Sequence, residues 1–255
     1  MKHFASHLTA IAAGLLLAAS SLHAGEKTRV LLVTGGHAFE RPQFFQMFEE
    51  NSGIAFQAVE HPDPKKQPGV ADPFLPMLKA DASKNYDVLV LYDMWQILPE
   101  DSKADFTRLL KEEGKGLVIL HHAIANYQDW PEYTNILGAR YYLKPTVVDG
   151  VEKPRSQWKH GVTFTARIAD AAHPVAAGLK DFEILDETYN GFDVRPEVKP
   201  LLTTTEATSG PVIGWTNRYG KSRVAFVQLG HDHFAYENPS YRKLVAQAIQ
   251  WTAGK

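Results

Sequence analysis

The chain has 255 residues, with 27 Lys and Arg against 29 Asp and Glu, so its net charge is −2. That balance offers no basic surface for nucleic acid or anionic lipid, and neither partner is expected. The sequence contains no cysteine, which excludes disulfides, thiolate metal ligands, a cysteine nucleophile and a lipid-modified cysteine.

The first 24 residues have the pattern of an export signal. Lys2 begins a short positive segment, and an apolar run over residues 8–18 follows that is too short to span a bilayer. Cleavage after Ala24 would leave residues 25–255 as a single domain. We therefore expect a periplasmic or secreted protein with no stable membrane insertion after signal removal. The alternative is an uncleaved membrane anchor.

The first half of the mature chain alternates strands and helices. Continuous apolar runs indicate buried strands at residues 29–34, 54–59, 86–92 and 116–120. Helices are predicted from Pro42 onward and over residues 101–113, where Gly114 supplies a C-terminal stop, and the Pro- and Asp-rich residues 61–76 predict a loop. This alternation predicts an α/β fold with a mainly parallel, doubly wound sheet and helices on both faces.

The pattern changes after about residue 139. Shorter strands of mixed direction are predicted at residues 160–168, 182–185, 198–205 and 211–215. The last strong strand covers residues 223–229. After it, Asn238-Pro239 begins a final helix with an apolar stripe.

Histidines follow three of the predicted strands. His37 comes after the first strand, His121 and His122 after the fourth, and His231 and His233 after the last. Open parallel sheets bind ligands outside the carboxyl ends of their strands, so these side chains should converge. Imidazole carries protons near neutral pH and binds zinc and other transition metals. We predict catalytic use of His121 and His122, and a divalent metal held by His37, His121, His231 and His233.

A pair of carboxylates, Asp186-Glu187, follows another apolar run. Adjacent residues on a strand face opposite ways, so one of the two should enter the site, and Glu187 is favoured as a catalytic base or metal ligand. His160 and His173 are predicted to be structural or peripheral. Each of these histidines and carboxylates could also serve only as a cap or a solvated strand end.

Aromatic residues occur in the same loops, and their faces suit the apolar C–H faces of sugar rings. The predicted substrate-binding residues are Trp95, Tyr127, Trp130, Tyr189 and Phe234. The alternative is that they are ordinary core residues. Neither a dinucleotide fingerprint nor a phosphate-binding loop occurs, so NAD and ATP are not expected.

Several short motifs, taken in order, resemble the trehalose-utilisation (ThuA-like) family, and the resemblance spans essentially the whole mature chain. The motifs are Val33-Thr34-Gly35-Gly36-His37, Gly116 to Ala123, Asp129-Trp130-Pro131, His173-Pro174, Asp186-Glu187-Thr188-Tyr189, Gly220 to Val224, Leu229-Gly230-His231 and Ile249-Gln250-Trp251. The resemblance implies a class I glutamine amidotransferase-like, flavodoxin-like fold. In glutamine amidotransferases a strand-to-helix elbow carries a cysteine nucleophile. Here the comparable turn carries His121-His122, which excludes thiol-based ammonia release.

The family name, and the family's association with oxidoreductases that form 3-keto sugars, imply a small carbohydrate as the substrate. The resemblance thus implies an enzyme that processes a disaccharide or keto-glycoside by acid–base or metal-assisted chemistry of the lyase or hydrolase type. A non-catalytic periplasmic sugar-binding protein and a metal-dependent hydrolase of another small molecule are the alternatives. Asp232-His233, directly after Gly230-His231, departs from the family pattern.

Overall fold

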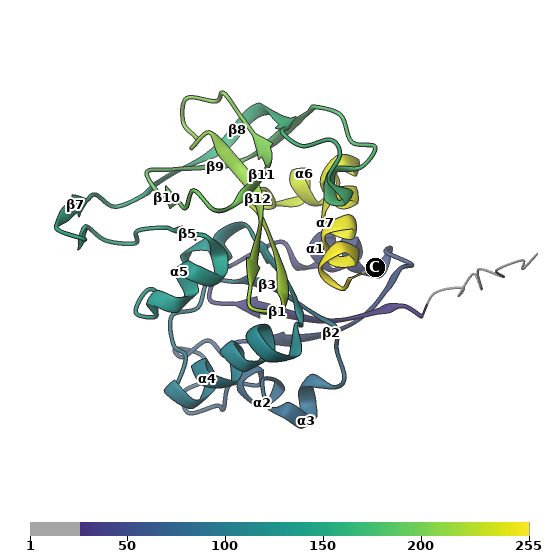
Figure 1. Ribbon diagram of the computed structural model, residues 1–255, viewed down its shortest axis with the longest axis vertical. Coiled ribbons are helices and arrows are strands. Elements are labelled where there is room, and N and C mark those ends of the chain that lie inside the picture. Colours follow the sequence, from purple (N-terminus) through teal and green to yellow (C-terminus); the bar gives the residue numbers. More distant parts are fainter. Residues whose placement is uncertain (1–25, 255) are drawn as a thin grey trace, which may run out of the picture.

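The computed structural model describes residues 26–254, so the predicted export signal lies outside the described residues. One nine-stranded sheet runs through this part of the chain, in the order β2-β1-β3-β4-β13-β12-β11-β8-β9 (Figure 1). Its first five strands are β2 (Ile54–Glu60), β1 (Thr28–Gly35), β3 (Val88–Asp93), β4 (Gly116–Leu120) and β13 (Ser222–Val227).

These five strands are parallel to one another. Val30 of β1, for example, lies opposite Phe56 of β2 and Val88 of β3, and β4 joins β3 to β13 with the same direction. The order is that of a flavodoxin-like doubly wound sheet, with β13 as the fifth parallel strand. The predicted fold class is therefore confirmed.

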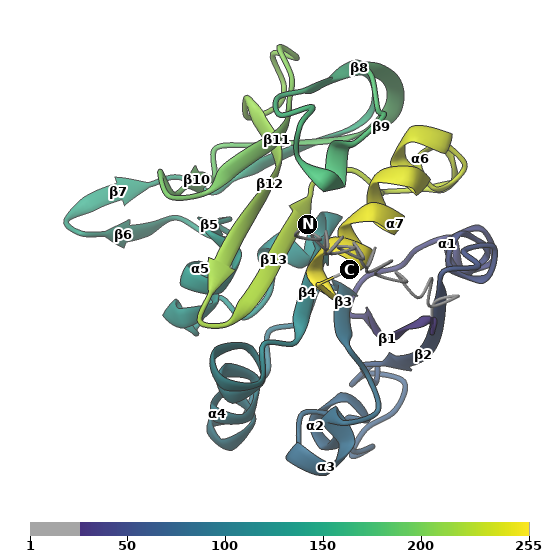
Figure 2. The ribbon, with the colours of Figure 1, turned by 45° about the vertical axis from the view of Figure 1, so that its right-hand side comes forward.

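Helices cover both faces of the parallel half, as predicted (Figure 2). On one face, α1 (Arg41–Glu49) and α7 (Pro239–Thr252) bury apolar side chains against β1, β3 and β4. On the other face lie α2 (Phe74–Met77), α4 (Glu100–Arg108) and α5 (Pro131–Leu137). Asn238 caps α7, because its side chain accepts from the backbone N–H groups of Ser240 and Tyr241.

The second half of the sheet is antiparallel. It contains β12 (Val212–Tyr219), β11 (Lys199–Thr203), β8 (Gln157–Ile168) and β9 (Phe182–Asn190). The sequence predicted only residues 182–185 of β9 as a strand. Pairing with β8 carries β9 on to Asn190, so Asp186 and Glu187 lie inside a strand. The helix predicted over residues 101–113 is α4 followed by a π-helical turn, Leu109–Glu113, which Gly114 ends with φ +71°.

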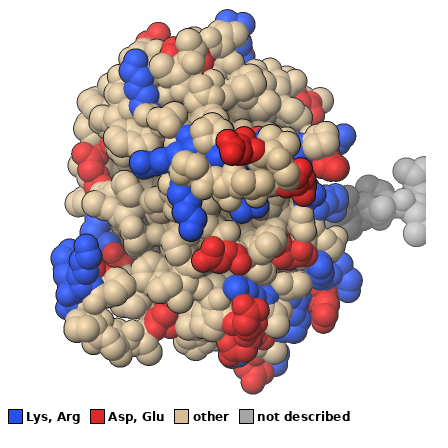
Figure 3. Space-filling model, turned by 90° about the vertical axis from the view of Figure 1, so that its left-hand side faces the viewer, with Lys and Arg blue, Asp and Glu red and all other residues tan. Residues whose placement is uncertain are grey.

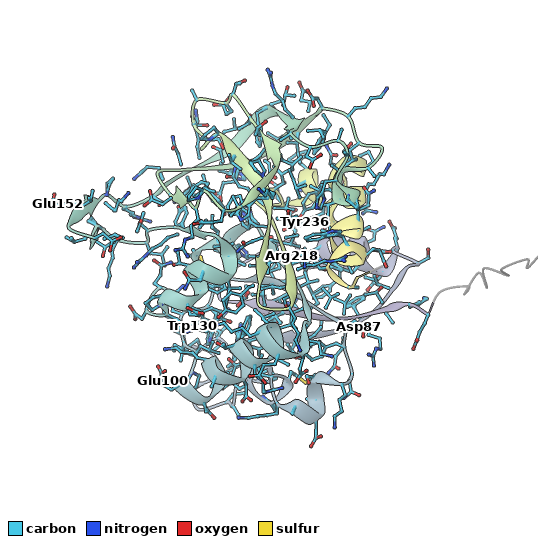
Figure 4. The ribbon with its side chains drawn as sticks, in the orientation of Figure 1. Asp87, Glu100, Trp130, Glu152, Arg218 and Tyr236 are labelled. Atoms are coloured by element: carbon cyan, nitrogen blue, oxygen red, sulfur yellow. The ribbon has the colours of Figure 1, made fainter. Side chains whose placement is uncertain are left out.

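Short helical elements and two small sheets complete the described residues. They include α3 (Ala80–Ser83), α6 (His233–Tyr236), the pair β5 (Ala139–Arg140) with β10 (Asp193–Val194), and the hairpin β6 (Thr146–Val148) with β7 (Val151–Lys153). The hairpin reaches away from the body, with Glu152 at its far end (Figure 4). Among residues 26–254 we find no helix that is long and apolar enough to cross a membrane.

The charged side chains of the surface are mixed in sign. On the face shown in Figure 3, Lys and Arg lie among Asp and Glu, with wide areas of uncharged residues between them. This mixture agrees with the net charge of −2. That face therefore offers no continuous basic surface of the kind that a nucleic acid would need.

Candidate functional site

The site begins where β4 ends. His121 opens a short 3-10 turn, His121–Ala125, and its φ of +51° places it in the left-handed region that non-glycine residues rarely adopt. The side chain is fully buried, and Nδ1 lies 2.7 Å from the carbonyl oxygen of Gln228. A carbonyl can only accept, so Nδ1 carries the proton and Nε2 of the neutral ring presents a lone pair.

Three polar groups surround His121 Nε2. The Tyr189 hydroxyl lies at 2.9 Å, His231 Nδ1 at 3.1 Å and Glu187 Oε2 at 3.4 Å. Glu187 Oε2 is also 3.6 Å from His231 Nδ1. His121 Nε2, His231 Nδ1 and Glu187 Oε2, the three atoms that could bind a metal, therefore form a nearly equilateral triangle.

This triangle has the dimensions of one face of a metal coordination sphere. Zinc–nitrogen bonds of about 2.0–2.1 Å in tetrahedral geometry place neighbouring ligand atoms about 3.3–3.4 Å apart. The three atoms are 3.1, 3.4 and 3.6 Å apart. Metal-binding histidines commonly donate their second ring N–H to a carbonyl or carboxylate, which orients the ring. The hydrogen bond from His121 Nδ1 to the carbonyl of Gln228 is of this kind. Within residues 26–254, no other group of three His, Asp or Glu brings its ligand atoms within 4.8 Å of one another.

Asp186 and Glu187 are neighbours on β9, and both carboxylates reach the turn that carries His231. The wholly buried Asp186 carboxylate accepts from the backbone N–H groups of Gly230 (2.8 Å), His231 (3.0 Å) and Glu187 (2.8 Å). Burial raises the pKa of Asp186 to about 6, although His121 and these N–H donors oppose the rise. Asp186 thus holds the turn that presents His231, while Glu187 points at the two imidazoles.

The charges in the triangle follow from burial and from neighbouring groups. Burial by itself would raise the pKa of Glu187, but its hydrogen bond to His121 and its attraction to the protonated forms of His121 and His231 outweigh burial, and the pKa is lowered. Burial and the neighbouring His121 lower the pKa of His231. Glu187 is therefore ionised and His231 neutral near pH 7, which are the forms that bind a metal. His231 retains 21% side-chain exposure, so the cluster reaches solvent on its side.

His122 lies behind His121, with the two ring centroids 5.2 Å apart. It packs between the rings of Tyr92, at 4.5 Å, and His37, at 4.7 Å. Burial, followed by the charges of His121 and His37, holds the pKa of His122 well below its usual range. Neither of its ring nitrogens makes a hydrogen bond within the described part of the chain. His122 is thus a buried, neutral wall of the cluster.

The structure brings His37 to the edge of this cluster. Its exposed ring lies 6.3 Å from that of His231, and its Nδ1 donates to the carbonyl of Ala38 at 2.8 Å. The preceding Gly36 has φ +75° and lies so close to the carbonyl oxygen of Met94 that a Cβ could not be accommodated. The loop that follows β1 therefore packs directly against the loop that follows β3.

His233, the fourth predicted metal ligand, is held elsewhere. Its Nδ1 lies 2.8 Å from Glu40 Oε2, and its backbone N–H donates to the same oxygen. His160, predicted to be structural or peripheral, is exposed and packs edge-on against His231, with the ring centroids 4.5 Å apart. His173 caps the 3-10 turn Pro174–Ala176, where its Nδ1 accepts from the backbone N–H of Val175.

The predicted substrate-binding aromatics occupy three environments. Tyr189 belongs to the cluster itself through its bond to His121. Tyr127 and Trp130 are buried and pack against one another in the core. Phe234 is exposed beside His233, while the half-buried Trp95 stacks on His61.

His61 is the residue that the sequence reasoning missed. Its buried ring lies between two carboxylates, with Nδ1 donating to Asp72 (2.7 Å) and Nε2 to Asp93 (3.1 Å). Burial lowers its pKa, but both hydrogen bonds and charges outweigh that effect and raise it to about 9. Asn126 also donates to Asp93, at 2.8 Å. His61 lies two residues after the strand predicted at residues 54–59 and directly after β2, so the strand-end rule applied to the other histidines would have found it.

The strand order defines the class of protein, a flavodoxin-like α/β protein, which here carries a polar cluster at the carboxyl edge of its sheet. Within this class, the chain belongs to the ThuA family, because the family model described as trehalose utilisation matches residues 29–252. This membership places the protein in carbohydrate metabolism in general. None of the curated proteins matches the sequence significantly.

Solved structures share the fold at low sequence identity. A ThuA-like protein from Parabacteroides merdae is 20% identical, with a TM-score of 0.74 and coverage of 90% of this chain and 91% of that one. A GMP synthase-like protein from Thermoplasma acidophilum is 11% identical, with a TM-score of 0.51 over 90% and 96% of the chains. The β-galactosidase of Bacillus circulans gives a TM-score of 0.54 at 11% identity, over 88% of this chain but 31% of that one.

Proposed function

We propose that this protein is an exported enzyme that processes a disaccharide or keto-glycoside by metal-assisted chemistry at His121, Glu187 and His231. The triangle formed by the ligand atoms of these residues carries the proposal. When bound there, a divalent metal such as zinc would stabilise negative charge that develops on a sugar oxygen. NAD and ATP have no role in the proposal.

The side chains have separate tasks in this scheme. A 3-keto group acidifies the C–H bond beside it, and removal of that proton allows the glycosidic oxygen to leave from the next carbon. Water then adds to the resulting double bond, which gives net cleavage of the glycoside. In this proposal His37 takes the first proton, which its exposure and its position at the edge of the cluster support. Tyr189 orients His121, and His122 keeps water from the buried side.

A metal-free variant of the same reaction is the second candidate. Glu187 is ionised and contacts two imidazoles, so it could itself remove the proton, with His121 or His231 holding the negative oxygen. The same geometry also suits hydrolysis of another small molecule when a metal is present.

The test begins with the mature chain, residues 25–255, purified without a histidine tag. Elemental analysis should find stoichiometric metal, which is lost in Glu187→Gln and in His121→Ala/His231→Ala but retained in the control His173→Ala. Absence of metal after reconstitution with zinc, iron, nickel and manganese would overturn the metal-assisted mechanism. Assays with 3-keto-glycosides should then show metal-dependent release of the aglycone. Stoichiometric metal without turnover of keto-glycosides would favour a metal-dependent hydrolase of another small molecule. Sugar binding without metal or turnover would favour a non-catalytic sugar-binding protein.

Export is part of the proposal and has its own test. Expression of the full chain in a Gram-negative host should place the protein in the periplasm or medium, with Gly25 as the first residue by mass spectrometry. An intact N-terminus in the membrane fraction would show the uncleaved anchor instead.

A further inference from the structure

A cavity of about 350 Å³ lies between the loop that follows β2 and the loop that follows β3. It is therefore at the same carboxyl edge of the sheet as the histidine cluster, but His121, Glu187 and His231 do not line it. Its volume is at the small end of the range for ligand pockets, about 300–1,000 Å³. Its walls are mainly proline rings and aliphatic side chains, with Trp95, Asp72 and Gln67 among them.

The one charged group in the wall, Asp72, is held in place from behind. Its Oδ2 accepts from His61 Nδ1 at 2.7 Å, and its Oδ1 accepts from the backbone N–H of Phe74 at 2.9 Å. Its side chain is 11% exposed, so it still faces the cavity. Because a buried imidazolium already pairs its charge, Asp72 offers the ligand an oriented hydrogen-bond acceptor more than a free negative charge.

Trp95 gives the cavity an aromatic wall whose orientation is also determined by His61. The two rings are stacked with their centroids 4.5 Å apart and their planes 3° from parallel. One face of the indole is therefore occupied by a cation, and the rest of the ring lines the cavity. The buried Nε1–H of Trp95 has no hydrogen-bond partner in the described part of the chain.

The outer wall of the cavity exposes large apolar side chains. Val70 is 53% exposed and Ile97 is 63% exposed, and both line the cavity together with four proline rings. Exposed apolar surface that surrounds a few oriented polar groups is typical of a ligand site.

We propose that this cavity binds a neutral polyhydroxylated ring, that is, one sugar unit of a glycoside, as a second ligand site separate from the histidine cluster. Trp95 and the proline rings pack on the apolar C–H face, while Asp72 and Gln67 bond the hydroxyl groups. A cationic ligand is disfavoured because His61 already occupies one face of Trp95 and pairs with Asp72. An anionic ligand is disfavoured because Asp72 and Asp93 place two negative charges around the single imidazolium.

The test uses the mature chain and trehalose as the probe, followed by amide NMR. Saturable shifts should appear in residues 62–75 and 95–99. Gln67→Ala should weaken binding roughly threefold to tenfold, the loss expected for one hydrogen bond. Ile97→Asp should weaken it further, because it places a charge against the apolar face of the ring. Val147→Asp is the matched control, since Val147 and Ile97 are both 63% exposed and Val147 lies on the β6–β7 hairpin.

Three outcomes would overturn the proposal: no saturable shift with trehalose, shifts confined to other parts of the chain, or displacement of trehalose by tetramethylammonium, which would indicate a cation site. Trehalose should bind equally well to His231→Ala, and loss of binding there would show that the cavity is not a separate site. Because this measurement needs neither metal nor turnover, it can succeed where the proposed enzyme activity fails, and the reverse.

Discussion

Two clusters of imidazole and carboxylate lie at the carboxyl edge of the sheet, and they differ in the ratio of the two groups. In the first, His121 and His231 share the single carboxylate of Glu187. In the second, Asp72 and Asp93 share the single imidazole of His61. The two clusters show how the same side-chain types give different chemistry.

The ratio determines which nitrogens keep a lone pair. Asp72 and Asp93 each accept a hydrogen bond from one ring nitrogen of His61, so both nitrogens are protonated and the pKa rises to about 9. This ring therefore has no free lone pair with which to bind a metal. Burial and a neighbouring imidazole lower the pKa of His231, and the backbone carbonyl of Gln228 leaves the lone pair of His121 on Nε2. The first cluster can therefore bind a metal or move a proton, whereas the second is an ion pair that fixes the orientation of Asp72 in the wall of the cavity.

The largest expected effect is the loss of His61. His61→Ala leaves the buried Asp93 and the largely buried Asp72 without their cation, and breaking a buried ion pair costs about 3–5 kcal/mol of folding free energy. Urea unfolding of this variant and of His173→Ala, a histidine outside both clusters, would measure the difference. Equal stability of the two variants would show that the His61 cluster is not a structural ion pair.

A pH titration sharpens the same point. The folded-state pKa of His61 is about 9, above its ordinary value of 6.5, so the stabilisation is complete below pH 6.5 and is lost as pH rises through 9. Wild-type stability should therefore fall by up to about 3 kcal/mol across that window. His61→Gln should lack this component of the fall, and unfolding curves at pH 6.5, 8 and 9.5 would test it. If stability fell equally with pH in the wild type and in His61→Gln, the raised pKa would not belong to His61.

A smaller effect is expected from Asp186→Asn. The amide nitrogen cannot accept from the N–H groups of Gly230 and His231, so the turn that presents His231 should loosen. We expect a loss of about 1–3 kcal/mol in stability, the cost of unsatisfied buried donors. Metal affinity should fall about 10–100-fold, which is the usual loss when a residue that orients a metal ligand is replaced. Calorimetric zinc titration, with the exposed Asp81→Asn as control, would measure it, and unchanged affinity would separate Asp186 from the site.

The smallest effect should come from His160→Ala. His160 contributes to the lowered pKa of His231, but burial and His121 contribute more. We therefore expect a slight rise in the pKa of His231 and a change in metal affinity of less than about threefold. Imidazole NMR would follow both. A loss as large as that of Glu187→Gln would make His160 a member of the ligand set.

The parallel half of the sheet was predictable from sequence because its signals are local. Apolar runs such as Val30 to Val33 indicate strands buried on both faces, and Asn238-Pro239 marks the start of the last helix. The strand-end rule also placed His121 and His231 at one edge of the sheet.

What the sequence by itself determined is therefore the fold class, the edge of the sheet that carries the polar residues, and the residue types available there. The tertiary structure alone decided which of them meet, because hydrogen-bond partners distant in sequence set each ring's direction and protonation. The carbonyl of Gln228 selects the tautomer of His121, Glu40 holds His233 away, and Asp72 and Asp93 keep His61 charged. No periodicity or spacing in a single chain records such pairings, since they depend on where separate loops come to rest.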